Sequence, residues 1–200
     1  MKKQVVVIHG GRTFKTYQEY IRSIRDREVS IDKFKIQKNW KDSLEKKLGE
    51  NFEVFAPHMP NGNNAVYEEW KIWFCRMVEF INDDAIFIGH SLGGIFLAKY
   101  ICENTCSKKI KAVILVAAPF NEDNMKECLG NFVPCSPFQN FCSQVKKTYL
   151  LFSKDDPVVP FKEAHKYKKA IPNSKIITFD DRQHFNQTHF PEIIELIKKL

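Results

Sequence analysis

A serine lies at the centre of a glycine-rich motif near the middle of the chain. Residues 89–94 read Gly-His-Ser-Leu-Gly-Gly, which places Ser91 in a G-x-S-x-G pattern. This pattern is typical of a serine held on a sharp turn between a strand and a helix, where only small residues fit two positions before and after it. The turn exposes the hydroxyl, and the N-terminus of the following helix favours developing negative charge. The motif therefore predicts that Ser91 is a catalytic nucleophile.

An unassisted serine hydroxyl is a poor nucleophile, so it needs a general base and a group that orients this base. On this kind of turn the partners follow in the order serine, acid, histidine. Residues 153–160, Ser-Lys-Asp-Asp-Pro-Val-Val-Pro, offer two adjacent acids, Asp155 and Asp156. Residues 180–185, Asp-Asp-Arg-Gln-His-Phe, offer the best-placed base, His184. Neighbouring residues of an extended segment point to opposite sides, so only one aspartate can face the imidazole.

The other histidines are weaker candidates for the base. His189, near the start of the last helical stretch, is the main competitor. His58 follows a strand and is expected to line a pocket, whereas His9 and His90 adjoin a glycine and the serine and are expected to shape turns. His165 lies within a helical stretch and is interpreted as a solvated side chain.

Acyl transfer through a serine also requires two backbone N–H groups aimed at the developing oxyanion. One is expected from Leu92, the residue after the serine. The other is expected from the turn His-Gly-Gly-Arg at residues 9–12, from the N–H of Gly11 or of Arg12. Glycine lets the backbone approach the substrate closely. The alternative interpretation, a turn without a catalytic part, remains open for this segment.

The surrounding elements indicate how these residues meet. Short apolar runs, too continuous for half-exposed strands, are typical of buried parallel strands. They cover residues 4–9, 52–56, 85–89, 112–117, 148–152 and 175–179, and stretches with helical spacing cover residues 40–48, 67–82, 92–103, 161–170 and 191–200. The alternation predicts an α/β fold with a mostly parallel sheet between two helical layers. Ligands in such sheets bind beyond the carboxyl ends of the strands, which is where Ser91, the two acids and His184 fall.

Two connections are longer than such a sheet requires. Segment 12–39 is basic and partly helical, and segment 121–145 contains Phe132, Phe138 and Phe141. Both follow strands and are expected to border the site. We predict that segment 12–39 is a cap or a partner surface outside the core, and that segment 121–145 is a lid loop. Its phenylalanines either hold an acyl or aromatic group of the substrate or pack the loop onto the core.

Composition is that of one globular domain over residues 1–200, with 44% hydrophobic and 28% charged residues. The first apolar run is too short for a signal peptide, and no later run reaches the length of a membrane span. We therefore expect a cytoplasmic protein.

The six cysteines are interpreted as reduced thiols. A metal site is not expected, because no histidine among them completes a zinc pattern.

Positive charge is concentrated in one part of the chain. The net charge is +7, and segment 12–47 contains many lysines and arginines interleaved with aromatic residues. Such a segment could hold phosphate or an acidic partner, but the acidic residues mixed into it favour solvated helix faces. The segment also motivates an alternative function, a module that binds a partner protein with weak or no turnover. Nucleic-acid binding is not expected, because only the charge supports it.

Four motifs carry a resemblance that spans nearly all of the chain. They are Val-Val-Val-Ile-His-Gly-Gly at 5–11, Phe-Ile-Gly-His-Ser-Leu-Gly-Gly at 87–94, Ser-Lys-Asp-Asp-Pro-Val-Val-Pro at 153–160 and Asp-Arg-Gln-His-Phe-Asn at 181–186. In these motifs the chain resembles the small serine hydrolases that include the retinoblastoma-binding serine hydrolase and its bacterial relatives. The resemblance implies a truncated, six-stranded α/β-hydrolase sheet, no cofactor, and a triad of Ser91, Asp156 and His184. Segment 12–39 and His9 depart from the family pattern, which affects the substrate pocket more than the triad.

These residues together predict a serine hydrolase. Its substrate would be a small molecule with a carboxylic ester or a related acyl group, cleaved through an acyl-enzyme.

Overall fold

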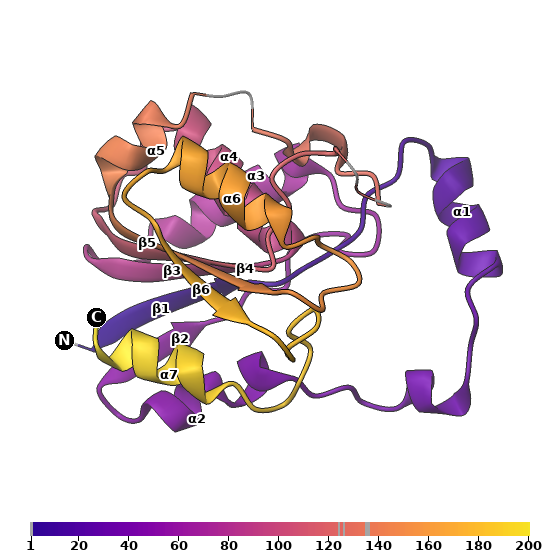
Figure 1. Ribbon diagram of the computed structural model, residues 1–200, viewed down its shortest axis with the longest axis horizontal. Helices are drawn as coiled ribbons and strands as arrows, with labels where there is room; N and C mark the ends of the chain where they lie inside the picture. Colours follow the sequence, from indigo (N-terminus) through magenta and orange to yellow (C-terminus); the bar gives the residue numbers. More distant parts are fainter. Residues whose placement is uncertain (1, 124, 126, 135–136) are drawn as a thin grey trace.

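In the described part of the chain, six strands form one parallel sheet in the order β2-β1-β3-β4-β5-β6 (Figure 1). The computed structural model describes residues 2–123, 125, 127–134 and 137–200. The strands are β1 (Lys3–Ile8), β2 (Phe52–Phe55), β3 (Ala85–His90), β4 (Ile110–Val116), β5 (Val145–Ser153) and β6 (Lys175–Phe179). Every neighbouring pair is parallel. The predicted α/β fold with a six-stranded sheet is confirmed.

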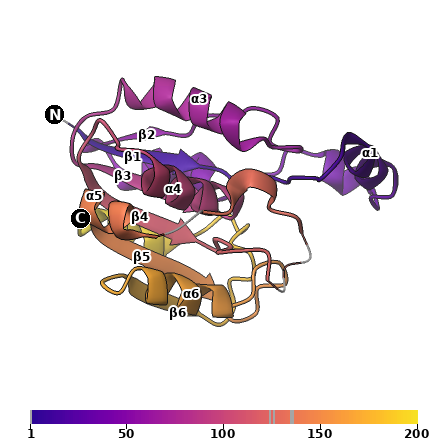
Figure 2. The ribbon, with the colours of Figure 1, turned by 90° about the horizontal axis from the view of Figure 1, so that it is seen from above.

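Helices cover both faces of the sheet (Figures 1 and 2). The α-helices are α1 (Tyr17–Arg25), α2 (Leu44–Leu48), α3 (Tyr67–Val78), α4 (Leu92–Glu103), α5 (Gln139–Gln144), α6 (Lys162–Ala170) and α7 (Pro191–Lys198), and the 3-10 helices are η1 (Ile31–Phe34), η2 (Trp40–Ser43) and η3 (Gly130–Phe132). Helices α3, α4 and α6 lie on one face, and α2 and α7 lie on the other. The three layers follow from the parallel order, because each crossover carries a helix.

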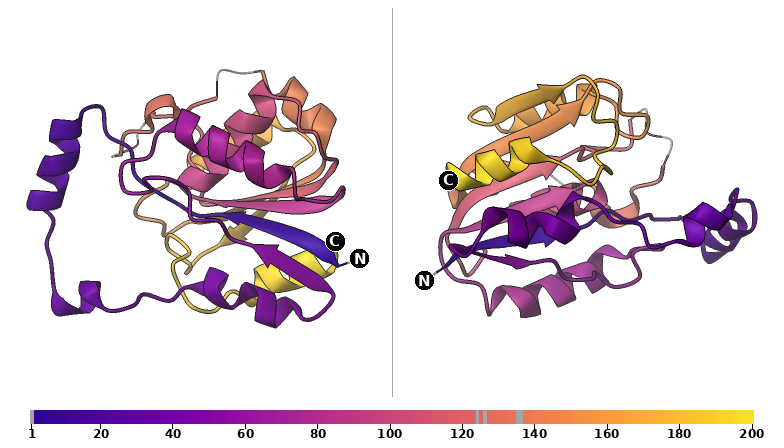
Figure 3. Two further views of the ribbon diagram at one scale, coloured as in Figure 1. Left: turned by 180° about the vertical axis from the view of Figure 1, so that it is seen from behind. Right: turned by 90° about the horizontal axis from the view of Figure 1, so that it is seen from below.

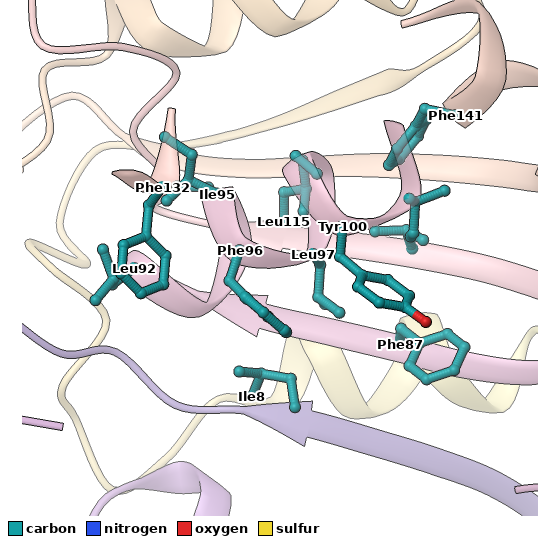
Figure 4. Close-up of a cluster of buried hydrophobic side chains, with 14 of the residues drawn as sticks. Ile8, Phe87, Leu92, Ile95, Phe96, Leu97, Tyr100, Leu115, Phe132 and Phe141 are labelled. Atoms are coloured by element: carbon teal, nitrogen blue, oxygen red, sulfur yellow. The ribbon is translucent and has the colours of Figure 1, made fainter. Parts of the chain in front are cut away.

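Each face of the sheet has its own hydrophobic core. The core under α3, α4 and α6 includes Trp70, Phe74 and Phe96, and the core under α2 and α7 includes Trp40, Phe185 and Phe190. Every residue of α4 from Leu92 to Ile101 is buried, and Figure 4 shows its side chains packed over the strands. A helix buried all round explains why this stretch is apolar at almost every position.

Glycines allow α4 to lie directly against β1. A Cβ atom added at Gly93 would overlap the backbone carbonyl oxygens of Ile8 and His9, and one added at Gly94 would overlap the side chain of Ala118. The turn between β3 and α4 can therefore be this tight only with glycine after the serine. The G-x-S-x-G motif is explained by packing, independently of chemistry.

Segment 12–39 projects from the body as an arm that carries α1 and η1 (Figures 1 and 3). None of the residues of α1, all of them described, is buried. Tyr17 is 64% exposed and Phe34 is 73% exposed. The arm rejoins the body at Trp40, which is only 2% exposed. The side chains of the arm therefore do not contribute to either core.

Segment 121–145 folds back onto the core and contains η3 and α5. Phe132, Phe138 and Phe141 are all buried in the core under α4. Of the two interpretations of these phenylalanines, packing of the loop is the one that the structure supports. Residues 124, 126 and 135–136 of the predicted lid loop, Cys135 included, lie outside the described residues.

The contact between α4 and β1 gives a first prediction. We expect Gly93→Ala to lower the free energy of unfolding by about 2–3 kcal/mol, because the new methyl group meets backbone oxygens that cannot rotate away. The control is Gly62→Ala, whose added Cβ would lie 3.2 Å from Cε1 of His9, a milder contact with a side chain instead of an overlap with backbone. We expect the control to change the free energy by less than about 1 kcal/mol. Urea unfolding followed by fluorescence measures both, and equal losses would show that this contact does not restrict the turn.

Candidate active site

Ser91 lies on the turn between β3 and α4 in a strained backbone conformation. Its φ is 53° and its ψ is −122°, in a region that residues with a side chain rarely adopt. The Ser91 N–H donates to Val116 O of β4 (2.8 Å), and the Gly94 N–H donates to Ser91 O (2.8 Å). These bonds hold the serine at the carboxyl end of β3, as the motif predicts.

The structure brings Ser91, His184 and Asp156 together from three different segments. The Nε2 atom of His184 lies 3.0 Å from Ser91 Oγ, and its Nδ1 atom lies 2.9 Å from Asp156 Oδ2. An ionised carboxylate only accepts hydrogen bonds, so Nδ1 carries the proton and Nε2 is free to accept from the serine hydroxyl. Asp156 is 1% exposed at its side chain, and its Oδ1 also accepts the N–H groups of Val158 (2.8 Å) and Val159 (3.0 Å).

The neighbouring aspartate has a different position and different partners. Oδ1 of Asp155 accepts the Ser153 hydroxyl (2.5 Å) and the Gln183 N–H (2.9 Å). The bond from Ser153 is the main reason that the pKa of Asp155 is lowered. Asp155 therefore ties the loop after β5 to the loop after β6, while Asp156 faces the imidazole. The two carboxylates do diverge, but the expected extended segment is wrong: Asp155 lies in a turn in which the Asp156 N–H donates to Ser153 O (3.4 Å).

Residues from distant segments support the loop that carries His184. The indole N–H of Trp40 donates to Phe185 O (2.9 Å), and the backbone N–H of Trp40 donates to Gln187 O (2.9 Å). His90 is 4% exposed, and its Nε2–H donates to His184 O (2.8 Å). Burial lowers the pKa of His90 well below its ordinary value, which keeps this ring neutral.

The remaining histidines do not touch Ser91. His189 is exposed, and its Nδ1 lies 3.3 Å from Lys47 Nζ. His165 is exposed on α6. Nε2 of His9 accepts the Met59 N–H (2.8 Å), so His9 shapes the turn after β1. His58 lines the pocket in front of Ser91, as expected from the sequence.

The two turns expected to form an oxyanion hole lie against each other. A Cβ atom added at Gly10 would be 3.2 Å from Ser91 Cβ, so the turn after β1 passes directly beside the serine. The Arg12 N–H donates to Gly62 O (2.9 Å), so this N–H does not point at an oxyanion. Of the two candidates in this turn, Gly11 is therefore the one left as a donor beside Leu92.

The serine opens into a polar pocket of about 630 Å³. The charged side chains among its described lining residues are Arg12, Arg27, Lys41 and Glu127. The sequence alone favours solvated helix faces for the basic residues of segment 12–47 and does not assign Lys41 to the site. Lys41 directly follows Trp40, a large apolar residue, and this neighbour was the signal in the sequence that the segment returns to the core at this point.

This arrangement, a serine on a strand-to-helix turn with a histidine and an acid on later loops of a parallel sheet, defines an α/β hydrolase. The chain belongs to the serine hydrolase family, whose family model matches residues 35–198.

Known proteins resemble the chain in sequence and in structure. Serine hydrolase RBBP9 of Rattus norvegicus is 27% identical over 151 residues, which cover 74% of this chain and 78% of the relative. The ydeN gene product of B. subtilis superposes with a TM-score of 0.78 at 20% identity, covering 99% of this chain and 98% of that one. An esterase domain from a Rhodothermus marinus protein gives a TM-score of 0.61 at 16% identity, covering 98% and 83% of the two chains. The structural neighbours share the α/β-hydrolase fold.

Two further findings concern the described residues alone. They contain no group of three or more His, Cys, Asp or Glu side chains placed to hold a metal ion. They also contain no helix that is both long and apolar enough to cross a membrane.

Proposed function

We propose that the protein hydrolyses carboxylic esters or related acyl compounds of small-molecule size through an acyl-enzyme. Ser91 is the nucleophile, His184 is the base and then the acid, and Asp156 orients the imidazole. The observation that supports this best is the continuous chain of hydrogen bonds from Asp156 through His184 to Ser91 Oγ. Membership of the serine hydrolase family and the fold shared with an esterase domain agree with it.

The reaction follows from the positions of these atoms. Ser91 Oγ attacks the carbonyl carbon while Nε2 of His184 takes the hydroxyl proton, and Asp156 stabilises the imidazolium. The N–H groups of Leu92 and Gly11 stabilise the oxyanion. Collapse of the tetrahedral intermediate breaks the bond to the alcohol oxygen, which leaves with the proton from Nε2. Water then attacks the acyl-enzyme with the same base, releasing the carboxylic acid and restoring Ser91.

The first test removes the nucleophile. Ser91→Ala is expected to fold normally, because alanine meets the same backbone strain as serine, and to lose both hydrolysis of p-nitrophenyl acetate and labelling by a fluorophosphonate probe. His189→Ala is the matched control and is expected to retain both, since His189 lies away from the site. Labelling of the folded Ser91→Ala protein would disprove the assignment of the nucleophile.

The second test separates the two aspartates. Asp156→Asn is expected to lower turnover at least about a hundredfold, because an amide can donate to Nδ1 and select the wrong tautomer. Asp155→Asn is expected to lower turnover less than about tenfold, since an amide oxygen can still accept from Ser153 and Gln183. Steady-state rates with p-nitrophenyl acetate decide the order. The reverse ranking would assign the orienting role to Asp155.

A second function, binding of a partner protein through segment 12–47, is favoured by one observation. The arm exposes several apolar side chains that contribute to no core: Val29 (67% exposed), Ile31 (75%), Phe34 (73%) and Ile36 (90%). Exposed apolar residues of this kind are typical of interaction surfaces. The mixture of these residues with lysines and arginines suits a partner with an acidic surface around an apolar patch.

Crosslinking distinguishes a partner surface from a cap. A photoreactive phenylalanine in place of Phe34 is expected to crosslink to one acidic protein in the native cell, and the same residue in place of the exposed Ile72 of α3 is the control. Replacing Val29, Ile31 and Ile36 together with serine, which keeps the photoreactive residue at position 34, is expected to abolish the crosslinked partner while substrate preference stays the same. A changed substrate preference without any partner would identify the arm as a cap instead.

A further inference from the structure

We propose that the pocket in front of Ser91 selects esters that carry a carboxylate, which the ammonium group of Lys41 binds with the guanidinium groups of Arg12 and Arg27 around it. This inference rests on the hydrolase activity proposed above and names the substrate class of the same site. The carboxylate is a recognition group and takes no part in bond breaking.

The charge of the pocket favours an anion. Three cationic side chains line it, and Glu127 is the acidic side chain among its described lining residues. Glu127 pairs with Arg12, since its Oε1 lies 3.3 Å from a guanidinium nitrogen of Arg12, which leaves Lys41 and Arg27 as the excess positive charge of the pocket. The apolar side chains among the described lining residues are Met59 and Val158. A cleft lined by one sign of charge concentrates ligands of the opposite sign.

Lys41 contacts the residue that precedes the nucleophile. Its Nζ lies 3.4 Å from Nδ1 of His90, and His90 directly precedes Ser91 in the chain. The other nitrogen of that ring donates to His184 O. An anion bound to Lys41 Nζ would therefore lie within the reach of a short acyl chain or an aromatic ring from the scissile carbonyl.

The surroundings of Lys41 leave its charge poorly compensated. Its Nζ lies 4.8 Å from the centre of the Trp40 ring, and its polar contact among the described residues is the neutral His90 ring. Asp42 is the nearest acidic neighbour in sequence; its Oδ2 accepts the Asn39 N–H (2.6 Å), and its charge raises the pKa of Lys41 by less than burial lowers it. Burial lowers the pKa of Lys41 to about 8. At neutral pH the ammonium is charged and partly desolvated, a state that a bound carboxylate would stabilise.

A purely structural role does not explain this placement. Trp40, and not Lys41, anchors the end of the arm to the His184 loop through two hydrogen bonds. Lys41 Nζ donates to Nδ1 of His90 and so favours the tautomer whose Nε2–H donates to His184 O, but this bond needs a donor and not a charge. A neutral side chain of similar length would fill the same space.

The carboxylate can belong to the acyl part or to the alcohol part of the ester, and paired probes distinguish these cases. On the acyl side we compare the mono-4-nitrophenyl ester of glutaric acid with its methyl-capped diester. On the alcohol side we compare 3-acetoxybenzoate with its methyl ester. Rates are corrected for uncatalysed hydrolysis, and the measured quantity is the ratio of kcat/KM for the acidic probe to that for the capped probe.

We expect one of the two ratios to exceed about ten in the unmodified protein, since a partly buried charge pair is stronger than an exposed one. Lys41→Met is expected to lower that ratio about tenfold, while Lys46→Met, an exposed lysine of α2, leaves it unchanged. Sodium chloride at 1 M is expected to lower the ratio in the unmodified protein but not in Lys41→Met. The salt dependence tests the proposal even if Lys41→Met folds poorly.

Two outcomes overturn the proposal in distinguishable ways. If all four probes are hydrolysed with a dependence on Ser91, the hydrolase assignment stands, but ratios near one show that selection of a carboxylate is wrong, and a ratio that survives in Lys41→Met shows that Lys41 is not the group that binds it. If no probe is hydrolysed and no fluorophosphonate labels Ser91, the proposed function fails and this inference fails with it.

Discussion

The close packing of α4 on β1 is the constraint on which the rest of the site depends. The helix lies so close to β1 that a Cβ atom at Gly93 would overlap the carbonyl oxygens of Ile8 and His9. To bring the helix this close, the chain turns abruptly between β3 and α4. The turn forces Ser91 to a positive φ and leaves its hydroxyl above the sheet. The same approach brings the turn after β1 beside the serine, where it offers backbone N–H groups. One packing contact thus supplies both the position of the nucleophile and the polar groups around it.

Local signals in the sequence were sufficient for the sheet and for most of the triad. Continuous apolar runs predicted each of the six strands, and Ser91 and His184 follow from their motifs. The predicted start of β5 lies three residues too late. Lys146 and Lys147, the second and third residues of the strand, are exposed and interrupt the apolar run. Alternation in an extended segment predicts that one aspartate alone faces the imidazole, whereas Asp155 lies in a turn, and the resemblance to known hydrolases was needed to select Asp156.

Contacts between distant segments could not be predicted. Nothing near Trp40 indicates that its indole reaches Phe185, and nothing near His90 indicates a bond to the carbonyl of His184. Lys41 reads as one of many lysines in a basic segment until the fold places it beside His90. The arm differs, because its length alone predicts that it lies outside the core, and its apolar side chains are exposed.

The hydrogen bond from Trp40 to Phe185 joins residues that are 145 positions apart. Such a contact cannot form until nearly the whole chain has been synthesised and has left the ribosome, and closing so long a loop carries an entropic cost. The strand-to-helix turn of Ser91, by contrast, depends on β1, β3 and β4, which are complete much earlier. The triad can therefore be complete only after His184 and the loop that follows β6 have been synthesised, and any shorter nascent chain has a serine without its base.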